Sequence, residues 1–193
     1  MSVLCIEEQQ LLEKIHHNIC QQGAPKIITI DGRSGAGKTT FSHSLYTYLN
    51  QRNIPSQIFT LENLYQGWNG LQAGIKQWHR NLNNLSDNPQ SPLIWFGWDW
   101  ETQQPTGPHL TTIDPRQTLI VEGVGATPPH SYQAPFNVIT CWLDMSSHHR
   151  KERALNRDGE TYRPYWDTWA EQENLQLPAH PASHIDYIFS PPV

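Results

Sequence analysis

The sequence has few cysteines and no cysteine pair. Its three cysteines, Cys5, Cys20 and Cys141, are far apart along the 193 residues, and none forms a C-x-x-C motif. This spacing excludes a disulfide framework and indicates no zinc site, so we expect a reducing, cytoplasmic environment. The sequence also lacks an apolar signal segment and an apolar run of membrane-spanning length. We therefore expect no membrane partner.

An excess of basic charge is absent as well. The formal net charge is -5 at pH 7, which argues against a polymeric nucleic acid as partner because such partners select for basic surfaces. Internal repeats and low-complexity stretches are absent too. A length of 193 residues suits one domain with a substantial core. We predict a single domain, 1–193, and make no prediction of its oligomeric state.

The most informative stretch that is present covers residues 26–40, KIITIDGRSGAGKTT. It contains G-x-x-x-x-G-K-[ST], the phosphate-binding P-loop motif. Residues 27–30 are rich in β-branched side chains, as in a buried parallel strand, and apolar residues recur at helical spacing after Thr39. A strand before the motif and a helix after it are the context that the P-loop requires.

The residue types of this motif suit ATP and Mg²⁺. Glycines let the backbone turn sharply and direct successive N–H groups at phosphate oxygens, and the following helix directs its positive end at the same anion. Lys38 would reach the β- and γ-phosphates as a catalytic group, and the Thr39 hydroxyl would hold Mg²⁺. The predicted nucleotide-binding residues of the loop are Gly32, Arg33, Ser34, Gly35, Ala36, Gly37, Lys38, Thr39 and Thr40.

The rest of the pattern alternates strands with helices. Further strands are predicted at 56–61, 118–122, 137–143 and 185–189, and helices at 1–22, 71–85, 146–157 and 165–175. The first helix has one apolar stripe and ends at Gly23 with Pro25 beyond. Residues 86–92 and 101–117 are predicted to be loops. The fold class is therefore α/β, a three-layer P-loop NTPase with a mostly parallel five-stranded sheet.

Two glutamates follow predicted strands, and ligands of open α/β sheets bind at the carboxyl ends of strands. Glu62 is interpreted as a general base or an indirect Mg²⁺ ligand, with an exposed loop acid as the alternative. Glu122, at the end of TLIVE, is the natural carboxylate to support Mg²⁺. Its alternative role is to cap the turn that follows.

Residues 93–100, LIWFGWDW, combine aromatic side chains with one acid. This combination suits a pocket that stacks a flat or sugar-like group and hydrogen-bonds its hydroxyls. A hydrophobic cover with Asp99 turned to solvent explains the pattern equally well.

Three arginines recur with the spacing i, i+3, i+7 on the predicted helix after 146. Arg150, Arg153 and Arg157 would share one face, and arginine clamps phosphate through a rigid fork. The alternative is a solvated face with local pairs to Glu152 or Asp158. Residues 158–164 read as a hinge-like loop, so 146–164 is predicted to form a lid.

The motifs together resemble the uridine kinase-like branch of P-loop kinases, and more closely a group of bacterial uridine kinase-like ATP-binding proteins. The resemblance covers about residues 26–189. Besides the P-loop it depends on LYQGWNGL (64–71), WDW (98–100), VEGVGA (121–126), RKERALNRDGE (150–160) and YWDTWAEQE (165–173).

The resemblance implies transfer of the ATP γ-phosphoryl group to a hydroxyl of a small acceptor, in a nucleoside/nucleotide-kinase-like fold with a mobile helical lid. Glu62 would occupy the place of the residue that activates the acceptor hydroxyl. Residues 62–117 would form the acceptor-site insertion, with Tyr65, Trp98 and Asp99 binding the acceptor. The lid would carry Arg150 on the nucleotide, with Arg153 and Arg157 as catalytic groups.

One departure from this group keeps other functions open. The group usually has two acids where this sequence has Glu62-Asn63, and this difference slightly favours a regulatory nucleotide-binding protein without transfer activity. A simple ATPase is the other alternative, and it would turn over ATP without an acceptor. The leading hypothesis is an ATP-dependent small-molecule kinase whose acceptor is a nucleoside or a similar metabolite.

Overall fold

The computed structural model describes residues 6–23, 26–177 and 184–192. Cys5 and Pro25 lie outside the described residues. The elements, in chain order, are α1 (Ile6–Gln22), β1 (Ile27–Asp31), α2 (Lys38–Asn50), β2 (Ser56–Thr60), the 3₁₀-helix η1 (Leu61–Leu64), α3 (Leu71–Asp87), β3 (Leu93–Asp99), β4 (Gln104–Thr111), β5 (Thr118–Glu122), β6 (Val138–Leu143), α4 (Ser147–Tyr162), the 3₁₀-helix η2 (Arg163–Tyr165), α5 (Trp166–Gln176) and β7 (Tyr187–Phe189).

The main sheet confirms the five predicted strands. Its order is β2-β5-β1-β6-β7, and every pairing is parallel. Strand β1 lies in the centre, where Ile27 is in register with Leu119 of β5 and with Val138 of β6. A central parallel strand is buried on both faces, which explains its continuous β-branched run. The P-loop therefore leaves the middle of the sheet.

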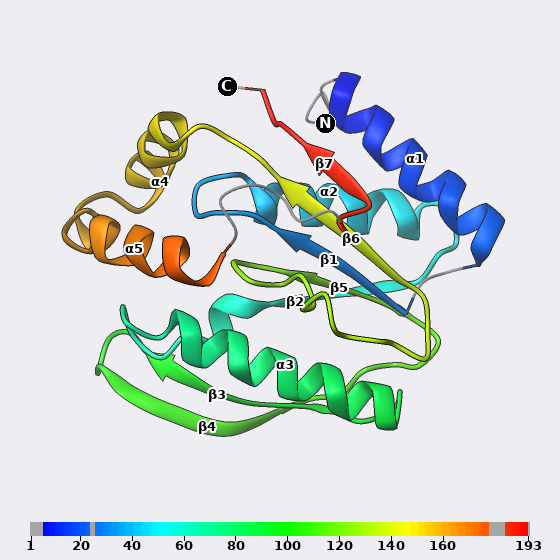
Figure 1. Ribbon diagram of the computed structural model, residues 1–193, viewed down its shortest axis with the longest axis horizontal. Helices are drawn as coiled ribbons and strands as arrows, with labels where there is room; N and C mark the ends of the chain where they lie inside the picture. The colour runs from blue at the N-terminus through cyan, green and yellow to red at the C-terminus, as the bar shows by residue number, and fades with distance from the viewer. Residues whose placement is uncertain (1–5, 24–25, 178–183, 193) are drawn as a thin grey trace.

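The sheet is covered on both faces, so the fold has three layers (Figure 1). Successive side chains of a strand point to opposite faces. Ile28 and Ile30 pack with α1 and α2 on one side, whereas Ile27 packs with α3 and α5 on the other. The two hydrophobic clusters are separate because the sheet lies between them. The predicted three-layer α/β class is confirmed.

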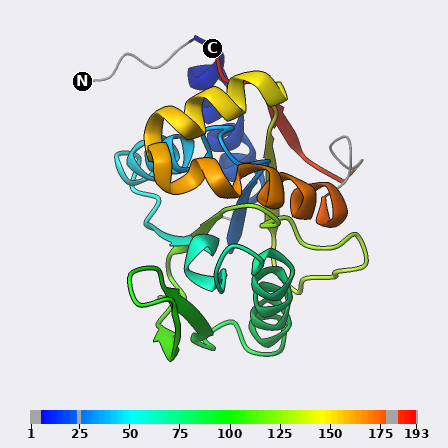
Figure 2. The same ribbon diagram turned by 90° about the vertical axis from the view of Figure 1, so that its left-hand side faces the viewer.

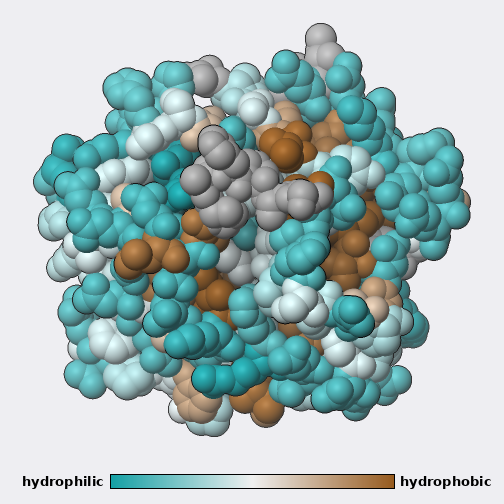
Figure 3. All heavy atoms as spheres, viewed as in Figure 1, coloured by the Kyte–Doolittle hydropathy of each residue, from teal (hydrophilic) through white to brown (hydrophobic). Residues whose placement is uncertain are grey.

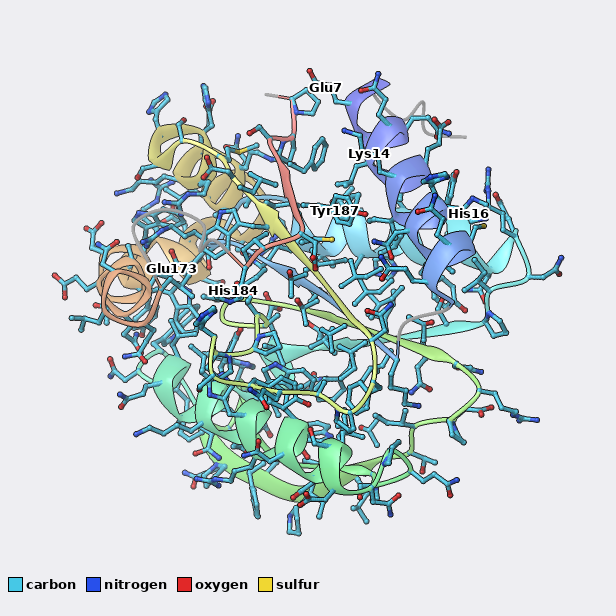
Figure 4. The ribbon with its side chains drawn as sticks, turned by 45° about the vertical axis from the view of Figure 1, so that its right-hand side comes forward. Glu7, Lys14, His16, Glu173, His184 and Tyr187 are labelled. Atoms are coloured by element: carbon cyan, nitrogen blue, oxygen red, sulfur yellow. The ribbon has the colours of Figure 1, made fainter. Side chains whose placement is uncertain are left out.

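Helix α1 packs beside the edge strand β7, as its apolar stripe predicted. Leu12 and Ile15 are fully buried, and the helix ends where the Gly23 N–H donates to the Ile19 carbonyl at 2.8 Å. Tyr187 of β7 lies beside this helix (Figure 4), and its hydroxyl donates to the Lys14 carbonyl at 3.5 Å. Helix α1 therefore covers one edge of the molecule, away from the P-loop.

The prediction that residues 101–117 form a loop is wrong. They contain β4, which pairs with β3 as an antiparallel hairpin. The side chains of Gln77 and Asn81 on α3 hold the other edge of β3 in the manner of a neighbouring strand. The Asn81 amide oxygen accepts from the Ile94 N–H at 2.9 Å, and the Gln77 amide oxygen accepts from the Phe96 N–H at 2.8 Å. Glycine, prolines and exposed side chains, which an edge strand tolerates, hide β4 in the sequence.

Helices α4 and α5 lie at the carboxyl ends of the main strands (Figures 1 and 2). The predicted hinge-like loop at 158–164 is instead mostly helical. The chain kinks at one residue, Gly159, whose backbone angles of φ 57° and ψ -136° interrupt the helix. A Cβ atom at this position would meet nothing within 4 Å, so the left-handed φ, and not a close neighbour, is the reason that glycine suits the bend. The segment 146–164, predicted to be a lid, is thus two helical arms joined at a bend.

The face seen in Figure 3 is mostly hydrophilic, with apolar side chains in separate patches. Within the described ranges, every helix is too short or too polar to cross a lipid bilayer.

Candidate nucleotide and acceptor site

The P-loop joins the carboxyl end of β1 to the first turn of α2. Gly37 is the N-cap of α2 and has φ 96°, a left-handed conformation that favours glycine, and no side chain caps the helix. The first N–H groups of α2 consequently remain available to an anion at the positive end of the helix. Gly35 permits a close approach, because a Cβ atom there would lie 2.2 Å from the Arg150 carbonyl oxygen. The backbone geometry fits a phosphate group.

Lys38 is buried at the base of this loop. Its Nζ donates to the Arg33 carbonyl at 3.1 Å. The residue also lines a cavity beside the P-loop, which is described below. An ammonium has three donors, so donors remain for phosphate oxygens. The sequence-based assignment of Lys38 to the β- and γ-phosphates fits this position.

Glu122 lies where strands β2, β5 and the P-loop helix meet. The Thr39 hydroxyl donates to one carboxylate oxygen of Glu122 at 3.3 Å, and the Thr60 hydroxyl donates to the other. A buried carboxylate beside a hydroxyl is a donor set that Mg²⁺ accepts, since this ion keeps several waters and takes few protein ligands. Thr39 and Glu122 would hold it.

The turn after β5 is capped by a residue to which the sequence analysis gave no role. The Asp31 carboxylate accepts the N–H groups of Gly32, Gly125 and Thr127 at 2.7, 2.8 and 2.9 Å. The structure therefore assigns to Asp31 the capping role considered for Glu122. Its position directly before the first P-loop glycine is the sequence signal that could have indicated it.

Glu62 lies in η1, directly after β2, and lines the same cavity as Lys38. The side chain is exposed to solvent at the cavity wall, as the alternative of an exposed acid expected, but protein atoms surround it closely enough to displace part of its water. Burial raises the pKa of the Glu62 carboxyl above its usual value, and the nearby charge of Glu122 raises it further. The charges of Lys38 and Arg157 partly oppose this rise. A raised pKa is what a general base working near neutral pH requires.

One cavity of about 1060 Å³ connects these groups. Its polar lining includes Lys38, Thr39, Glu62, Arg153 and Arg157. The volume lies at the upper end of the range of small-molecule sites, which is compatible with a nucleotide and a second small molecule.

A cluster of aromatic side chains lines the other part of this cavity, and sequence reasoning missed most of it. Trp68 stacks on Tyr165, with ring centroids 4.4 Å apart and planes at 8°, and on Tyr162 at 5.3 Å and 16°. Trp100 lies 4.8 Å from Trp68. These residues come from three separate segments, so only the unusual number of tryptophans, 8 in the chain, could have signalled the cluster.

Of the three residues predicted to bind an acceptor, only Tyr65 lines the cavity. Its buried hydroxyl donates to the Val124 carbonyl at 2.9 Å, and its ring packs edge-on against Trp169 with centroids 5.2 Å apart. Trp98 packs against Gly67 instead. Asp99 is also placed away from the cavity, because its carboxylate accepts the N–H groups of Glu101 and Thr102 in the turn between β3 and β4. The hydrogen bonds of this turn explain why an acid stands at position 99. This agrees with the alternative in which Asp99 lies outside a ligand pocket.

The three arginines of the predicted stripe have different surroundings. Arg153 and Arg157 line the cavity, and Arg157 pairs with Asp158 at 2.6 Å. Arg150 is buried outside the cavity, where its Nη1 donates to the Ser34 carbonyl at 3.0 Å. The expectation that Arg150 contacts the nucleotide as part of a clamp is therefore not met. Helical spacing placed the three on one face but could not show which end of that face is buried.

Comparisons with known proteins agree on the fold. A family model described as threonylcarbamoyl adenosine biosynthesis protein TsaE matches residues 6–99, slightly less than half of the chain. A search of curated proteins found no match.

Two solved structures are similar over nearly the whole chain. One is described as a possible uridine kinase from Bacillus stearothermophilus, with 20% identity, a TM-score of 0.60, and coverage of 95% of this chain and 100% of that chain. The other is a candidate fructose transport system kinase from Silicibacter sp. TM1040, with 14% identity, a TM-score of 0.66, and coverage of 96% and 100%. The fold is that of the P-loop NTPases, a class that in general binds ATP with Mg²⁺ and either hydrolyses it or transfers its phosphoryl group.

Proposed function

We propose that this protein transfers the γ-phosphoryl group of ATP to a hydroxyl of a small molecule. The observation that carries the proposal is the single cavity that contains the P-loop lysine, Glu62 and the aromatic cluster around Trp68. A site built for hydrolysis alone needs room for ATP and one water. This cavity offers, next to the phosphate site, an aromatic-lined space suited to a second organic molecule.

The residues divide the chemistry among themselves. Lys38 and the N-terminus of α2 hold the phosphates, and Arg153 and Arg157 supply positive charge from the lid. Glu62 accepts the proton of the acceptor hydroxyl. The hydroxyl oxygen forms a bond to the γ-phosphorus, and the bond between the γ-phosphorus and the bridging oxygen breaks, which releases ADP. Mg²⁺, held by Thr39 and Glu122, would neutralise charge on the phosphates. Closure of the lid and the aromatic rings over bound substrates would limit the access of water, which would otherwise hydrolyse ATP.

Within the P-loop class, the motif set favours a uridine kinase-like enzyme. We propose a nucleoside or similar metabolite as acceptor, no polymeric nucleic acid or membrane as partner, and a cytoplasmic location. Asn63 replaces an acid that the resembling group usually has, so Glu62 acts here as a lone carboxylate at the end of β2.

A second candidate is an ATPase or a nucleotide-dependent regulator. The observation that favours it is the TsaE family model, whose match covers β1, the P-loop and Glu62. Such a protein would bind Mg-ATP in the same site and use the aromatic space for a partner or leave it to solvent.

The test is transfer of label from γ-labelled ATP across a panel of nucleosides, nucleotides, sugars and cofactor precursors. Lys38→Ala should abolish transfer through loss of ATP binding, and Glu62→Gln should preserve ATP binding while transfer falls at least about a hundredfold. Lys76→Ala and Glu171→Gln are matched controls, because both residues are exposed and lie outside the cavity.

The outcomes separate the candidates. A labelled acceptor whose formation depends on Lys38 and Glu62 supports the kinase. Release of phosphate at the same rate with and without every acceptor supports the ATPase. Tight, Lys38-dependent ATP binding with neither product supports the regulator.

A further inference from the structure

One P-loop residue, Ser34, has all its polar groups bound by α4, which carries the predicted lid segment, and by α5, which follows it; these two are called the lid helices below. Its N–H donates to the Glu173 Oε1 at 2.7 Å, and its carbonyl accepts from the Arg150 guanidinium at 3.0 Å. Its hydroxyl accepts from the Trp169 indole N–H at 2.9 Å. Arg150 belongs to α4, whereas Trp169 and Glu173 belong to α5. Both lid helices are therefore fastened to the same residue of the phosphate-binding loop.

Glu173 is the buried centre of this contact. It lies on the inner side of α5 (Figure 4), and its side chain is only 1% exposed. Two cations balance its charge, with Arg150 Nη1 at 3.6 Å and Arg33 Nη1 at 3.9 Å from its Oε2. A buried ion pair is weak evidence for stability, since an apolar pair often serves as well. The arrangement is better explained by what the carboxylate holds.

What it holds is the backbone that leads into the phosphate-binding turn. Ser34 immediately precedes Gly35, and the backbone of Gly35 lies against that of Arg150 so closely that a Cβ atom would not fit. Fixing the N–H and the carbonyl of Ser34 fixes both of its peptide planes. The second plane contains the Gly35 N–H, so its direction is set as well, and the chain enters the turn that carries the next N–H groups, which the phosphates would use, from a fixed start. The lid thus acts on the loop from behind, without contacting a phosphate at this point.

We propose that Glu173 is a positioning residue for the phosphates of ATP. It holds the P-loop in its binding conformation through the Ser34 N–H. This role rests on one part of the proposed function, the binding of ATP at the P-loop. The base of the lid, formed by Arg150, Trp169 and Glu173, is accordingly docked before any nucleotide arrives.

The experiment compares two neutral substitutions of similar size. Glu173→Gln keeps a side-chain oxygen that accepts the Ser34 N–H, whereas Glu173→Met fills the same space without an acceptor. Isothermal titration calorimetry would give the Kd of Mg-ATP for each. We expect Glu173→Gln to bind within about threefold of wild type and Glu173→Met to bind at least about tenfold more weakly, the effect of losing one buried hydrogen bond at the loop.

Glu171, exposed on the same helix, supplies matched controls. Glu171→Gln and Glu171→Met repeat both changes two residues away, and both should bind Mg-ATP as wild type does. Thermal unfolding of every variant shows whether each is folded at the titration temperature. A purely structural Glu173 would give two folded variants of equal affinity, which overturns the proposal.

Two further results complete the test. Trp169→Phe keeps an aromatic ring but loses the donor to the Ser34 hydroxyl, so its affinity for Mg-ATP should fall about two- to fivefold. Should Glu173→Met fail to fold, wild-type affinity in Trp169→Phe overturns the proposal. Failure of the wild-type protein to bind Mg-ATP would refute the proposed function and the positioning role together. Tight wild-type binding with equal Gln and Met variants would refute the positioning role alone.

Discussion

Asp31 is a buried carboxylate beside the P-loop that accepts three backbone hydrogen bonds, and its substitution by asparagine gives a measurable test. The side chain is 1% exposed. One of its oxygens accepts the N–H groups of Gly32 and Gly125, and the other accepts the N–H of Thr127. Asp31 therefore joins the start of the P-loop to the turn that follows Glu122.

The loss can be estimated from this geometry. Asparagine has one accepting oxygen and one NH₂ group, so its favoured orientation keeps the Gly32 and Gly125 bonds and turns a donor toward the Thr127 N–H. One charge-assisted hydrogen bond is lost, and one N–H is left facing another donor. Hydrogen bonds to charged groups contribute about 1.5–3 kcal/mol, and an unsatisfied buried group costs about 1–3 kcal/mol. Because these values overlap in part, we expect Asp31→Asn to lower the free energy of unfolding by about 2–4 kcal/mol.

Urea unfolding followed by far-UV circular dichroism would measure the change, and Tm should fall by about 4–16 °C for a chain of this size. Asp167→Asn is the control, since Asp167 is 87% exposed and its pair with Lys151 is on the surface. The control should change the free energy by less than about 0.5 kcal/mol. Equal effects of the two substitutions would refute the reasoning, because they would show that the three hydrogen bonds of Asp31 contribute no more than a surface pair.

Two other predictions concern the cavity and the lid. The rate of transfer should rise with pH as Glu62 loses its proton and then level off. The midpoint of this rise should lie above the pKa of an ordinary glutamate, because burial raises the pKa of Glu62. A pH–rate profile that is flat down to about pH 4 would contradict the role of Glu62 as a base. Arg150→Ala should lower the free energy of unfolding by about 3–5 kcal/mol because it leaves the buried Glu173 with one partner fewer. Arg153→Ala should change stability by less than about 0.5 kcal/mol yet weaken Mg-ATP binding. The reverse order in urea unfolding would show that the two arginines are misassigned.

The sequence predicted the central sheet well because its physical signal is local. Strands β1 and β5 are short runs of fully buried, mostly β-branched residues, and the helix after the P-loop shows its apolar period directly. Glu62 and Glu122 were predicted to lie near the phosphate site for a topological reason, since Glu62 follows β2 and Glu122 ends β5, and these parallel strands end at the same edge of the sheet.

The remainder of the site depends on contacts that no local pattern contains. The aromatic cluster combines Trp68 with Tyr162 and Tyr165, which are almost a hundred positions away in the sequence. The contact between Glu173 and Ser34 spans 139 positions. The strand β4 was missed because its stability comes from pairing with β3 and not from burial of its own side chains, most of which are exposed.

Asp99 shows the converse error. An acid between tryptophans has the composition of a ligand pocket, but a carboxylate that follows a strand can also accept the N–H groups of the next turn. The two roles require the same residue type at the same position. The choice between the two roles depends on which side of the hairpin faces the cavity. The alternation of side chains along β3 does not predict that side, because a bulge shifts the register between Trp95 and Gly97.

The stacked rings at Trp68 also give the cavity a spectroscopic signal. Parallel aromatic rings at van der Waals distance couple their electronic transitions, and such coupling gives strong bands in near-ultraviolet circular dichroism and alters tryptophan emission. Because Tyr162 ends α4 and Tyr165 ends η2, while Trp68 belongs to the loop before α3, the coupling exists only while these two parts of the chain are together. A molecule that binds between these parts, or a movement that separates them, would therefore change the near-ultraviolet circular dichroism and the tryptophan emission of the unlabelled protein.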